Sequence, residues 1–367
     1  MTEGRARGGE RTLPTERGVV TARPDLGGGS ATPSFRDLGA AASDEGWHPL
    51  GPGDRRDRPS PTTIGGRRFA WGARTYVMGI VNVTPDSFSG DGLLADRTPI
   101  ERATAPVADA ASVADATAVA LEVAGRMIAE GADLIDVGGE STRPGHEIVD
   151  ADEEARRVVP VVAAIRAAHP AVPISIDTTK PSVAAAAIDA GASLVNDIWG
   201  VAPDSSLARL AAERGVPIVL MHNRAAASYD DVVEEVIDEL AAAVRRAIDA
   251  GIPEDAIVVD PGFGFGKAPR HNLELLARLE RLTALGRPIL FGASRKSTLG
   301  KVLDLPPEDR LEATLATTAL AVAAGVDIVR VHEVAENVRV ARMADAVVRG
   351  WDPAQAPADL SGPEARS

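Results

Sequence analysis

The sequence contains no cysteine, few aromatic residues and no long apolar run. The absence of cysteine excludes disulfides, zinc thiolate sites, iron–sulfur ligation and a thiol nucleophile. Only 3% of the residues are aromatic, too few for a platform on which nucleic-acid bases stack. No stretch approaches the roughly 20 consecutive apolar residues that a membrane-spanning helix needs, and the polar N-terminus does not have the apolar segment of a secretory signal peptide. These absences favour a cytoplasmic enzyme.

The charge balance is acidic and the length allows a substantial core. The 367 residues contain 39 lysines and arginines against 53 aspartates and glutamates, a formal net charge of -14. Nucleic-acid binding depends on clustered positive charge, so this balance argues against a nucleic-acid partner. With 45% hydrophobic and 25% charged residues, the composition is typical of a globular protein with one large domain or two smaller ones.

The N-terminal segment differs in composition from the rest of the chain. Residues 1–60 contain nine arginines and nine acidic residues, so the whole net charge of -14 falls in residues 61–367. Seventeen of these sixty positions are glycine or proline, and no apolar periodicity is visible. We expect residues 1–63 to form a disordered extension, either a dispensable tail or the carrier of a partner motif, and residues 351–367 to form a flexible C-terminal tail.

Short β-branched runs alternate with alanine-rich stretches from Ile64 onward. The segment from Arg68 to Tyr76, around Gly72, predicts a short N-terminal hairpin. Eight strand-like runs follow, at 76–83, 134–137, 174–177, 194–197, 217–221, 256–259, 288–291 and 328–331. Helices are expected near 117–130, 152–168, 181–190, 205–214, 230–250, 271–284, 310–324 and 334–348. Eight such units within residues 64–350 predict a parallel (β/α)8 TIM barrel of the α/β class. A dinucleotide-binding sheet is disfavoured because no GxGxxG opens the first unit.

One connection in this pattern is unusually long. Residues from about 93 to 116 form a stretch rich in alanine, aspartate and proline after the first strand. It exceeds the roughly 2–6 residues of an ordinary βα connection. Because it follows a barrel strand, it would lie at the catalytic mouth of the barrel. A mobile lid and an insertion without function are both open interpretations.

Polar side chains follow every predicted strand at its carboxyl end, where the catalytic residues of TIM barrels are found. Helix capping explains some of them, because aspartate and asparagine are common N-caps. It explains Asp177, Asn196 and Asp260 poorly, because these residues come at or directly after apolar strands. The chain also has 35 arginines but only four lysines, and Lys296 is one of three lysines in strand-end loops, which favours a function for it.

Four longer segments at these strand ends form distinctive motifs. They are Met78-Gly79-Ile80-Val81-Asn82-Val83-Thr84-Pro85-Asp86-Ser87-Phe88-Ser89, Asp136 through Gly145, Asp260 through Lys267, and Ser294-Arg295-Lys296-Ser297. These segments resemble motifs of the dihydropteroate synthase family. They occur in family order, and the resemblance extends over about residues 64–350. It implies a pterin-binding TIM-barrel transferase of folate biosynthesis. Such an enzyme condenses 6-hydroxymethyl-7,8-dihydropterin diphosphate with 4-aminobenzoate, by dissociative displacement at the pterin methylene carbon, to give 7,8-dihydropteroate and diphosphate.

The resemblance implies a pterin site between the strand ends. A pterin edge presents two adjacent N–H donors, and one carboxylate can accept both, which is the role expected for Asp260. The implied pterin-binding residues are Asp136, Asp177, Asn196, Met221, Asp260, Phe265 and Lys296. Met221 and Phe265 could equally be ordinary core residues. The expected catalytic residues are Lys296, Arg330 and Asp260, and nothing in the reaction requires an imine on Lys296.

The leaving diphosphate and the attacking amine need groups of their own. For the diphosphate the resemblance implies Asn82, Arg143, Arg330 and His332, with the cofactor Mg²⁺ bound by Asn82. His332 could instead cap a loop, but Arg330, two positions earlier on an alternating strand, would point the same way. For 4-aminobenzoate the implied residues are Thr142, Pro144, Phe265, Lys296 and Ser297. A homodimer through the last helices is also implied.

Two positions depart from the family pattern. The first loop ends in Ser89-Gly90-Asp91-Gly92 where Ser-Asp-Gly-Gly is usual, and Glu333 stands where aspartate is common. The altered loop puts loop closure and sulfonamide sensitivity in doubt, and it is the one feature that favours a non-catalytic pterin-binding paralogue. A corrinoid-dependent methyltransferase shares the barrel but would not be expected to carry the first and last of the four motifs together. The expected partners are the two small-molecule substrates, with no nucleic acid and no membrane.

Overall fold

A computed structural model of the chain describes residues 58–83, 110–140, 149–204 and 206–351. The strands are β1 (Thr62–Ile64), β2 (Arg67–Phe69), β3 (Tyr76–Asn82), β4 (Leu134–Gly138), β5 (Ile174–Asp177), β6 (Leu194–Asp197), β7 (Ile218–Met221), β8 (Ile257–Asp260), β9 (Leu290–Phe291) and β10 (Ile328–Val331). The α-helices are α3 (Ala110–Ala129), α4 (Ala151–Ala168), α5 (Pro181–Asp189), α6 (Ser206–Arg214), α7 (Val232–Asp249), α8 (Pro269–Ala277), α9 (Ser297–Leu303), α10 (Leu311–Ala323) and α11 (Val334–Arg349). Short 3-10 helices are η2 (Glu254–Ala256), η3 (Leu279–Leu285) and η4 (Pro307–Asp309).

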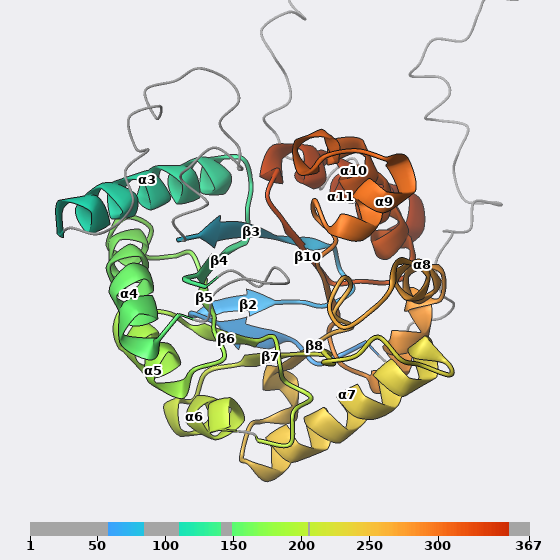
Figure 1. Ribbon diagram of the computed structural model, residues 1–367, viewed down its shortest axis with the longest axis horizontal. Helices are drawn as coiled ribbons and strands as arrows, with labels where there is room; N and C mark the ends of the chain where they lie inside the picture. The colour runs from blue at the N-terminus through green and yellow to red at the C-terminus, as the bar shows by residue number, and fades with distance from the viewer. Residues whose placement is uncertain (1–57, 84–109, 141–148, 205, 352–367) are drawn as a thin grey trace, which may run out of the picture. The chain divides into compact units, whose positions relative to one another are not determined.

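The parallel strands close into a barrel. Eight strands form one sheet in the order β8-β7-β6-β5-β4-β3-β10-β9. The two ends of this order meet, because Val259 of β8 forms a parallel bridge with Ile289, next to β9. Figure 1 shows the helices arranged around this ring of strands. The predicted (β/α)8 barrel is confirmed, and each predicted barrel strand lies within two residues of an observed one.

The N-terminal hairpin lies earlier in the chain than predicted. β1 pairs antiparallel with β2, and its turn is formed by Gly65 and Gly66, whose φ angles are 56° and 80°. The prediction of a hairpin around Gly72 was therefore wrong. Two consecutive glycines allow the left-handed turn that a two-residue hairpin needs. Because β1 begins at Thr62, the boundary predicted at residue 63 falls inside the folded part. Residues 1–57 and 352–367 of the two predicted tails lie outside the described residues.

Two helices also differ from the prediction. α3 begins at Ala110, so the last residues of the predicted 93–116 insertion belong to a helix, while residues 84–109 lie outside the described part of the chain. α9, the helix that starts at Ser297, was not predicted, because its seven residues follow directly on a motif read as a loop. In place of one helix near 271–284, the chain forms α8 and the 3-10 helix η3.

The helix starts follow from local sequence. The side chain of Asp150 accepts a hydrogen bond from the Glu153 amide at the start of α4, and Asp231 accepts from the Val233 and Glu234 amides at the start of α7. These carboxylates satisfy N–H groups that have no partner inside the helix. No helix among the described residues is long and apolar enough to cross a membrane.

The interior of the barrel is filled at its amino end by an apolar floor. Hairpin residues pack there against side chains from the barrel strands, in the cluster Ile64, Phe69, Trp71, Tyr76, Met78, Leu134, Leu194, Val219, Val258, Leu290 and Ile328. The rings of Phe69, Trp71 and Tyr76 contact one another with centroids 4.7–5.5 Å apart. In Figure 1, β2 is seen inside the ring of strands. A second, larger core lies between the sheet and the surrounding helices.

Candidate functional site

The candidate site lies one layer above the apolar floor. Successive side chains of a strand point to opposite faces, so a residue two positions beyond a floor residue also points into the barrel. The pairs of floor and site residues are Leu134 and Asp136, Leu194 and Asn196, Val219 and Met221, Val258 and Asp260, and Ile328 and Arg330. The alternation therefore brings these five predicted residues together at the carboxyl ends of the strands.

Arg330 connects three predicted pterin-site residues. Its Nε donates to Oδ2 of Asp136 at 2.6 Å, and its Nη2 donates to Oδ2 of Asp177 at 2.7 Å. Nδ2 of Asn196 donates to the same Asp136 oxygen at 3.1 Å. The sequence predicted all four residues near the mouth, with Arg330 as a catalytic and diphosphate-binding residue and not as a partner of the pterin residues. The ion pairs join the expected pterin and diphosphate residues into one network.

Two acceptors in this network point to a ligand. Oδ1 of Asp136 and Oδ1 of Asn196 are buried and have no hydrogen-bond partner within the described part of the chain. A buried polar atom without a partner costs free energy, and native proteins leave few of them. Asp136 is fully buried and Asn196 is 2% exposed. The layer therefore offers acceptor atoms to a ligand that carries N–H donors.

Burial and neighbouring charges shift the ionisation of the site. Burial raises the pKa of Asp177 to about 7, against the opposing attraction of Arg330. Burial also raises the pKa of Asp260, and Lys296 counteracts that rise. The pKa of Lys296 is lowered to about 8, mainly by burial, with the nearby Asp260 opposing the shift. Buried groups with shifted pKa values and opposite charges are typical of functional sites.

Asp260 is held by the loop that follows β8. The Gly262 amide donates to Oδ1 of Asp260 at 2.7 Å. The loop reverses direction through Gly262, Gly264 and Gly266, whose φ angles are 67°, 85° and 54°. A Cβ on Gly262 would lie 1.8 Å from the His222 carbonyl oxygen, so this position requires glycine for space as well as for conformation.

Gly262→Ala is expected to lower the free energy of unfolding by at least about 3 kcal/mol, because a left-handed alanine and a backbone clash are combined. Urea denaturation followed by circular dichroism measures the change. Gly286→Ala is the matched control, because Gly286 has a similar φ of 62° but nothing within 4 Å of the added Cβ. The control should lose only about 1 kcal/mol. Equal losses in the two variants would contradict the role of the close approach to His222.

Lys296, which precedes α9, contacts two residues of the loop that follows β8. Its Nζ donates to the Phe263 carbonyl and lies 4.4 Å from the ring centroid of Phe265. Phe265 is half-buried, and Ser297, the first residue of α9, is exposed at the mouth. These three residues, which the sequence assigned to 4-aminobenzoate, lie on the loop after β8 and at the start of α9. Met221 is 3% exposed and lies in the interior layer.

The predicted diphosphate residues lie around β3 and β10. Asn82 is the exposed last residue of β3. Nδ1 of His332 lies 2.9 Å from Oγ of Ser294, and the His332 amide also donates to that oxygen at 3.3 Å. Glu333 accepts a hydrogen bond from Arg295. The unusual Glu333 therefore anchors the segment that carries Lys296, and Ser294 orients His332, a contact that the sequence did not reveal.

Three predicted residues cannot be placed. Thr142, Arg143 and Pro144 lie outside the described residues, as do residues 84–92 of the first loop. Glu140, which precedes them in the connection after β4, is described. Lys180 Nζ donates to Glu140 and to Oε2 of Glu154, the latter at 2.5 Å. Lys180, another of the lysines in the strand-end loops, therefore lies in an ion-pair cluster with Glu140 and Glu154.

Comparison with known proteins gives a consistent result. The family model described as pterin binding enzyme matches residues 107–332. The dihydropteroate synthase of Clostridium beijerinckii is 47% identical over 287 residues, which covers 78% of this chain and 99% of that protein. The chain belongs to the dihydropteroate synthase family. Its match to nearly the whole length of this relative shows that the resemblance is not limited to a shared motif.

Solved structures of this family agree with the fold. A crystal structure of dihydropteroate synthase from Clostridium difficile in the presence of pteroic acid has 45% sequence identity and a TM-score of 0.69, covering 77% of this chain and 99% of that one. The Xanthomonas albilineans dihydropteroate synthase with 4-aminobenzoic acid has 40% identity and a TM-score of 0.69, covering 79% of this chain and 98% of that one. The family membership predicted from the four sequence motifs is confirmed.

Proposed function

We propose that the protein is a dihydropteroate synthase, which condenses 6-hydroxymethyl-7,8-dihydropterin diphosphate with 4-aminobenzoate to form 7,8-dihydropteroate and diphosphate. One observation carries this proposal: Asp136, Asn196, Asp260 and Arg330 lie in a single interior layer of a barrel that belongs to this family. The reaction transfers the pterin methylene group to an amine, so the enzyme is classed with the transferases of alkyl and aryl groups other than methyl.

The interior layer provides acceptors for the pterin. Oδ2 of Asp260 would accept the two adjacent N–H groups of the pterin edge, while the Gly262 amide holds the other carboxylate oxygen. Oδ1 of Asp136 and Oδ1 of Asn196, which lack partners among the described residues, would accept from other ring nitrogens. Met221 and the Phe265 ring would cover the faces of the heterocycle, and Lys296 would donate to its carbonyl and N5 side.

Positive charge at the same end would stabilise the departing diphosphate. The bond between the methylene carbon and the diphosphate oxygen breaks, and its electron pair leaves with the diphosphate. Arg330 and His332, with Arg143, would bind that developing charge. Two carboxylates already contact Arg330, so the diphosphate would compete with Asp136 and Asp177 for the guanidinium.

Mg²⁺ would be held here mainly by the substrate. The described residues contain no group of three or more histidine, aspartate or glutamate side chains able to hold a metal ion, and Asn82 offers one exposed amide at the end of β3. Mg²⁺ prefers oxygen ligands, retains water and is commonly bound through substrate phosphates, so a single asparagine oxygen fits its needs. When bound, the ion neutralises part of the diphosphate charge.

The amine enters from the outer side of the layer. Its nitrogen lone pair forms the new C–N bond at the methylene carbon, and the nitrogen loses a proton to water or to the released diphosphate. Phe265, Lys296 and Ser297, together with Thr142 and Pro144, would hold the 4-aminobenzoate ring and carboxylate. The site therefore acts mainly by positioning two reactants and by neutralising the leaving group.

A turnover assay tests the proposal directly. The purified protein is incubated with both substrates and Mg²⁺ while 7,8-dihydropteroate is followed by chromatography. We expect product formation that requires all three components. If the protein binds the pterin normally but forms no product, it is the non-catalytic paralogue that the altered first loop would favour. The cytoplasmic location stays a prediction from the sequence.

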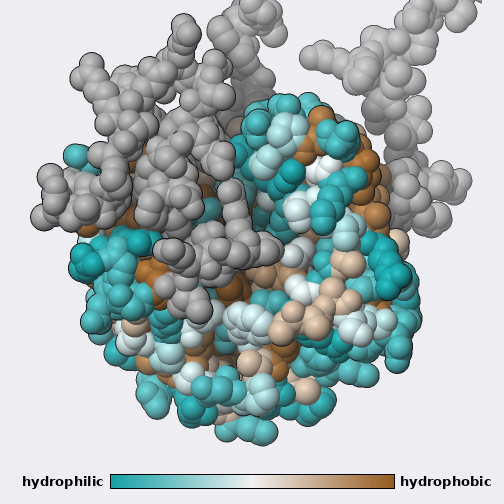
Figure 2. Space-filling model, viewed as in Figure 1, coloured by the Kyte–Doolittle hydropathy of each residue, from teal (hydrophilic) through white to brown (hydrophobic). Residues whose placement is uncertain are grey.

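The homodimer predicted from the family is proposed to form through α10 and α11. These helices expose Leu320 (56%) and Met343 (66%), and Figure 2 shows brown apolar side chains among hydrophilic ones over the region of α9 to α11. Replacing both residues with glutamate should convert a dimer to a monomer that stays folded, as measured by sedimentation velocity and circular dichroism. Leu273→Glu on α8, which is 43% exposed, is the control. A wild-type monomer would contradict the proposal.

A further inference from the structure

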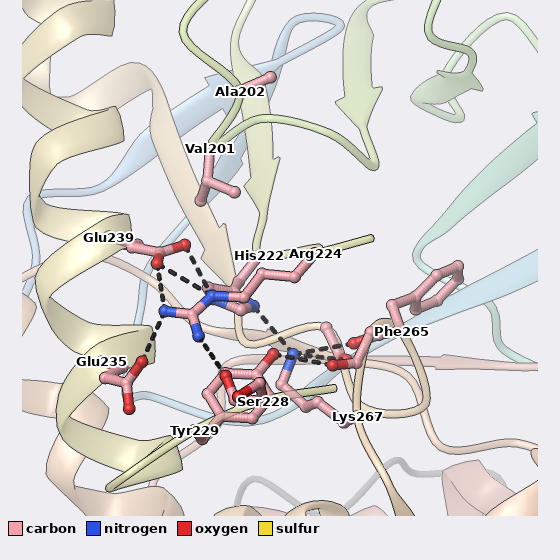
Figure 3. Close-up of polar contacts among 12 residues, drawn as sticks. Val201, Ala202, His222, Arg224, Ser228, Tyr229, Glu235, Glu239, Phe265 and Lys267 are labelled. Atoms are coloured by element: carbon pink, nitrogen blue, oxygen red, sulfur yellow. Dashed lines mark hydrogen bonds and ion pairs between the residues drawn. The ribbon is translucent and has the colours of Figure 1, made fainter. Parts of the chain in front are cut away.

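Lys267 occupies a cage of three neutral acceptors behind the candidate site. Its Nζ lies 3.1 Å from the Gly262 carbonyl oxygen, 3.1 Å from the Phe265 carbonyl oxygen and 2.9 Å from Nδ1 of His222. An ammonium group has three N–H donors, and the cage offers one acceptor for each. Figure 3 shows the lysine end enclosed by the loop after β8 and by His222. All three donors are therefore directed at protein atoms and not at the barrel interior.

The histidine of this cage is itself held in one tautomer. His222 is fully buried, and an ammonium group on Lys267, 2.9 Å from Nδ1, makes Nδ1 the acceptor and places the ring proton on Nε2. Nε2 lies 3.2 Å from Oε2 of Glu239 on α7, a charge contact that favours the proton on Nε2, although Nε2 forms no hydrogen bond within the described part of the chain. Glu239 and Glu235 both pair with Arg224, and Arg224 Nη1 donates to the Ser228 carbonyl at 2.8 Å. The cage is thus tied to the first two turns of α7, as Figure 3 shows.

The caged loop carries the residues of the candidate pterin site. Gly262 forms a hydrogen bond with each of two functional residues. Its amide donates to Asp260, and its carbonyl accepts from Lys267. The Phe265 carbonyl accepts from Lys267, while the Phe265 ring lies under Lys296. Tyr229 adds a third attachment, because its hydroxyl donates to the Gly266 carbonyl at 2.9 Å. A change at Lys267 therefore reaches Asp260 through a single residue, Gly262.

We propose that Lys267, in its ammonium form, is a positioning residue for pterin binding, which holds the loop after β8 so that Asp260 and Phe265 are correctly placed. This role rests on the proposed function of the site but adds a residue that does not touch the substrate. With the His222 proton on Nε2, a neutral amine, which has two donors, would leave one of the three acceptors without a hydrogen bond. The ammonium form is the one that satisfies the whole cage.

Several charges face this ammonium. They are Asp260 on β8, Lys296 before α9, Arg224 after β7 and Glu239 on α7, and Tyr229 presents its ring at 6.0 Å. Burial, the main cause, together with Lys296 and Arg224, lowers the pKa of Lys267 to about 7, and Asp260 and Glu239 oppose the shift. In the folded protein Lys267 loses its proton above about pH 7. Below that pH the buried ammonium lowers the free energy of unfolding, so this cost to stability is largest at low pH. A disfavoured charge kept in a saturated cage is consistent with a functional role.

The first experiment measures binding of 6-hydroxymethylpterin by titration calorimetry at pH 6.5. Lys267→Met keeps the side-chain stem but removes all three donors, and we expect the dissociation constant to rise about tenfold or more. Lys301→Met, on the exposed side of α9, is the matched control and should leave it unchanged. If the wild type does not bind the pterin, the proposed function fails. If Lys267→Met binds as tightly as the wild type, the positioning role fails.

The second experiment uses the unaltered protein, so it does not depend on the variant folding. The chain has four lysines, and lysine labelled with ¹³C at Cε gives four resonances. Because Lys296 also has a lowered pKa, the resonances of Lys180, Lys296 and Lys301 are each assigned by their loss in a lysine-to-methionine variant, and the remaining one belongs to Lys267. Binding and protonation are reciprocally linked, so a ligand that favours the ammonium form must raise its pKa. We expect saturation with neutral 6-hydroxymethylpterin to raise the Lys267 pKa by about one unit. An unchanged or lowered pKa would overturn the proposal.

Discussion

Replacing Asp260 with asparagine is expected to weaken binding of 6-hydroxymethylpterin by at least about 100-fold, because two charge-assisted hydrogen bonds are lost. The amide keeps the shape of the side chain, and its oxygen can still accept from the Gly262 amide at the 2.7 Å position. Its NH₂ group would then face the donors of the pterin edge, which makes the contact repulsive. Titration calorimetry measures the dissociation constant.

Asp197→Asn provides the control for removing a buried carboxylate from a neighbouring strand end. Asp197 is 7% exposed and follows Asn196, so the alternation of β6 points it away from the barrel interior. Its carboxylate accepts from the Trp199 amide at 3.0 Å. Pterin binding should be unaffected in this variant. If Asp260→Asn and Asp260→Ala both leave the pterin dissociation constant within a few-fold of the wild type, the assignment of Asp260 is wrong.

Arg330→Met is expected to lower kcat/KM at least about 100-fold and to destabilise the fold by about 3–5 kcal/mol. The substitution removes the cation that pairs with Asp136 at 2.6 Å and Asp177 at 2.7 Å, and it leaves both carboxylates in a site where burial disfavours charge. Arg246→Met is the control, because Arg246 is half-buried and its guanidinium donates to the Val201 carbonyl at 2.8 Å. The free energies of unfolding come from urea denaturation.

The pH dependence of the Arg330 variant has a definite sign. Burial raises the pKa of Asp177 from its ordinary 3.8 to about 7 even with Arg330 present. Protonation is thus favoured by folding, and the stability that Asp177 contributes falls as pH rises from about 4 to 7. Without Arg330 the pKa rises further, so the fall extends to higher pH. The variant should be closer to the wild type at pH 5 than at pH 8. A loss of stability that is independent of pH would contradict this account of the pair.

Local sequence patterns were sufficient for most of the fold and for the position of the site. Parallel strands are short, apolar and regularly spaced, so their ends could be located from residues such as Leu134, Leu194 and Val258. The two-residue period then places Asp136, Asn196 and Asp260 in one layer. The hairpin was misplaced because Gly72 was taken as the turn, although the adjacent Gly65 and Gly66 have the left-handed conformation that the turn requires.

The pairing within the site could not be read from the sequence. Arg330 contacts Asp136, 194 residues away in the chain, and Asp177, 153 residues away. A sequence motif identifies such residues but does not say which ones neutralise each other. The cage around Lys267 was missed for the same reason, since His222 lies 45 residues earlier and on another strand end. Closure of the barrel determines both sets of neighbours.

The apolar floor has a consequence for the order of events. Phe69, Trp71 and the strand residues around them fill the amino end of the barrel. Substrates can therefore enter the interior layer, and products can leave it, only from the opposite end. Asp136 is fully buried in the interior layer, whereas Ser297 is exposed at the carboxyl end of the barrel. On the proposed function, the heterocycle would arrive before the amine, and the joined product would leave through the same end. An amine that arrives early would block the passage, so substrate inhibition by excess 4-aminobenzoate follows from the architecture.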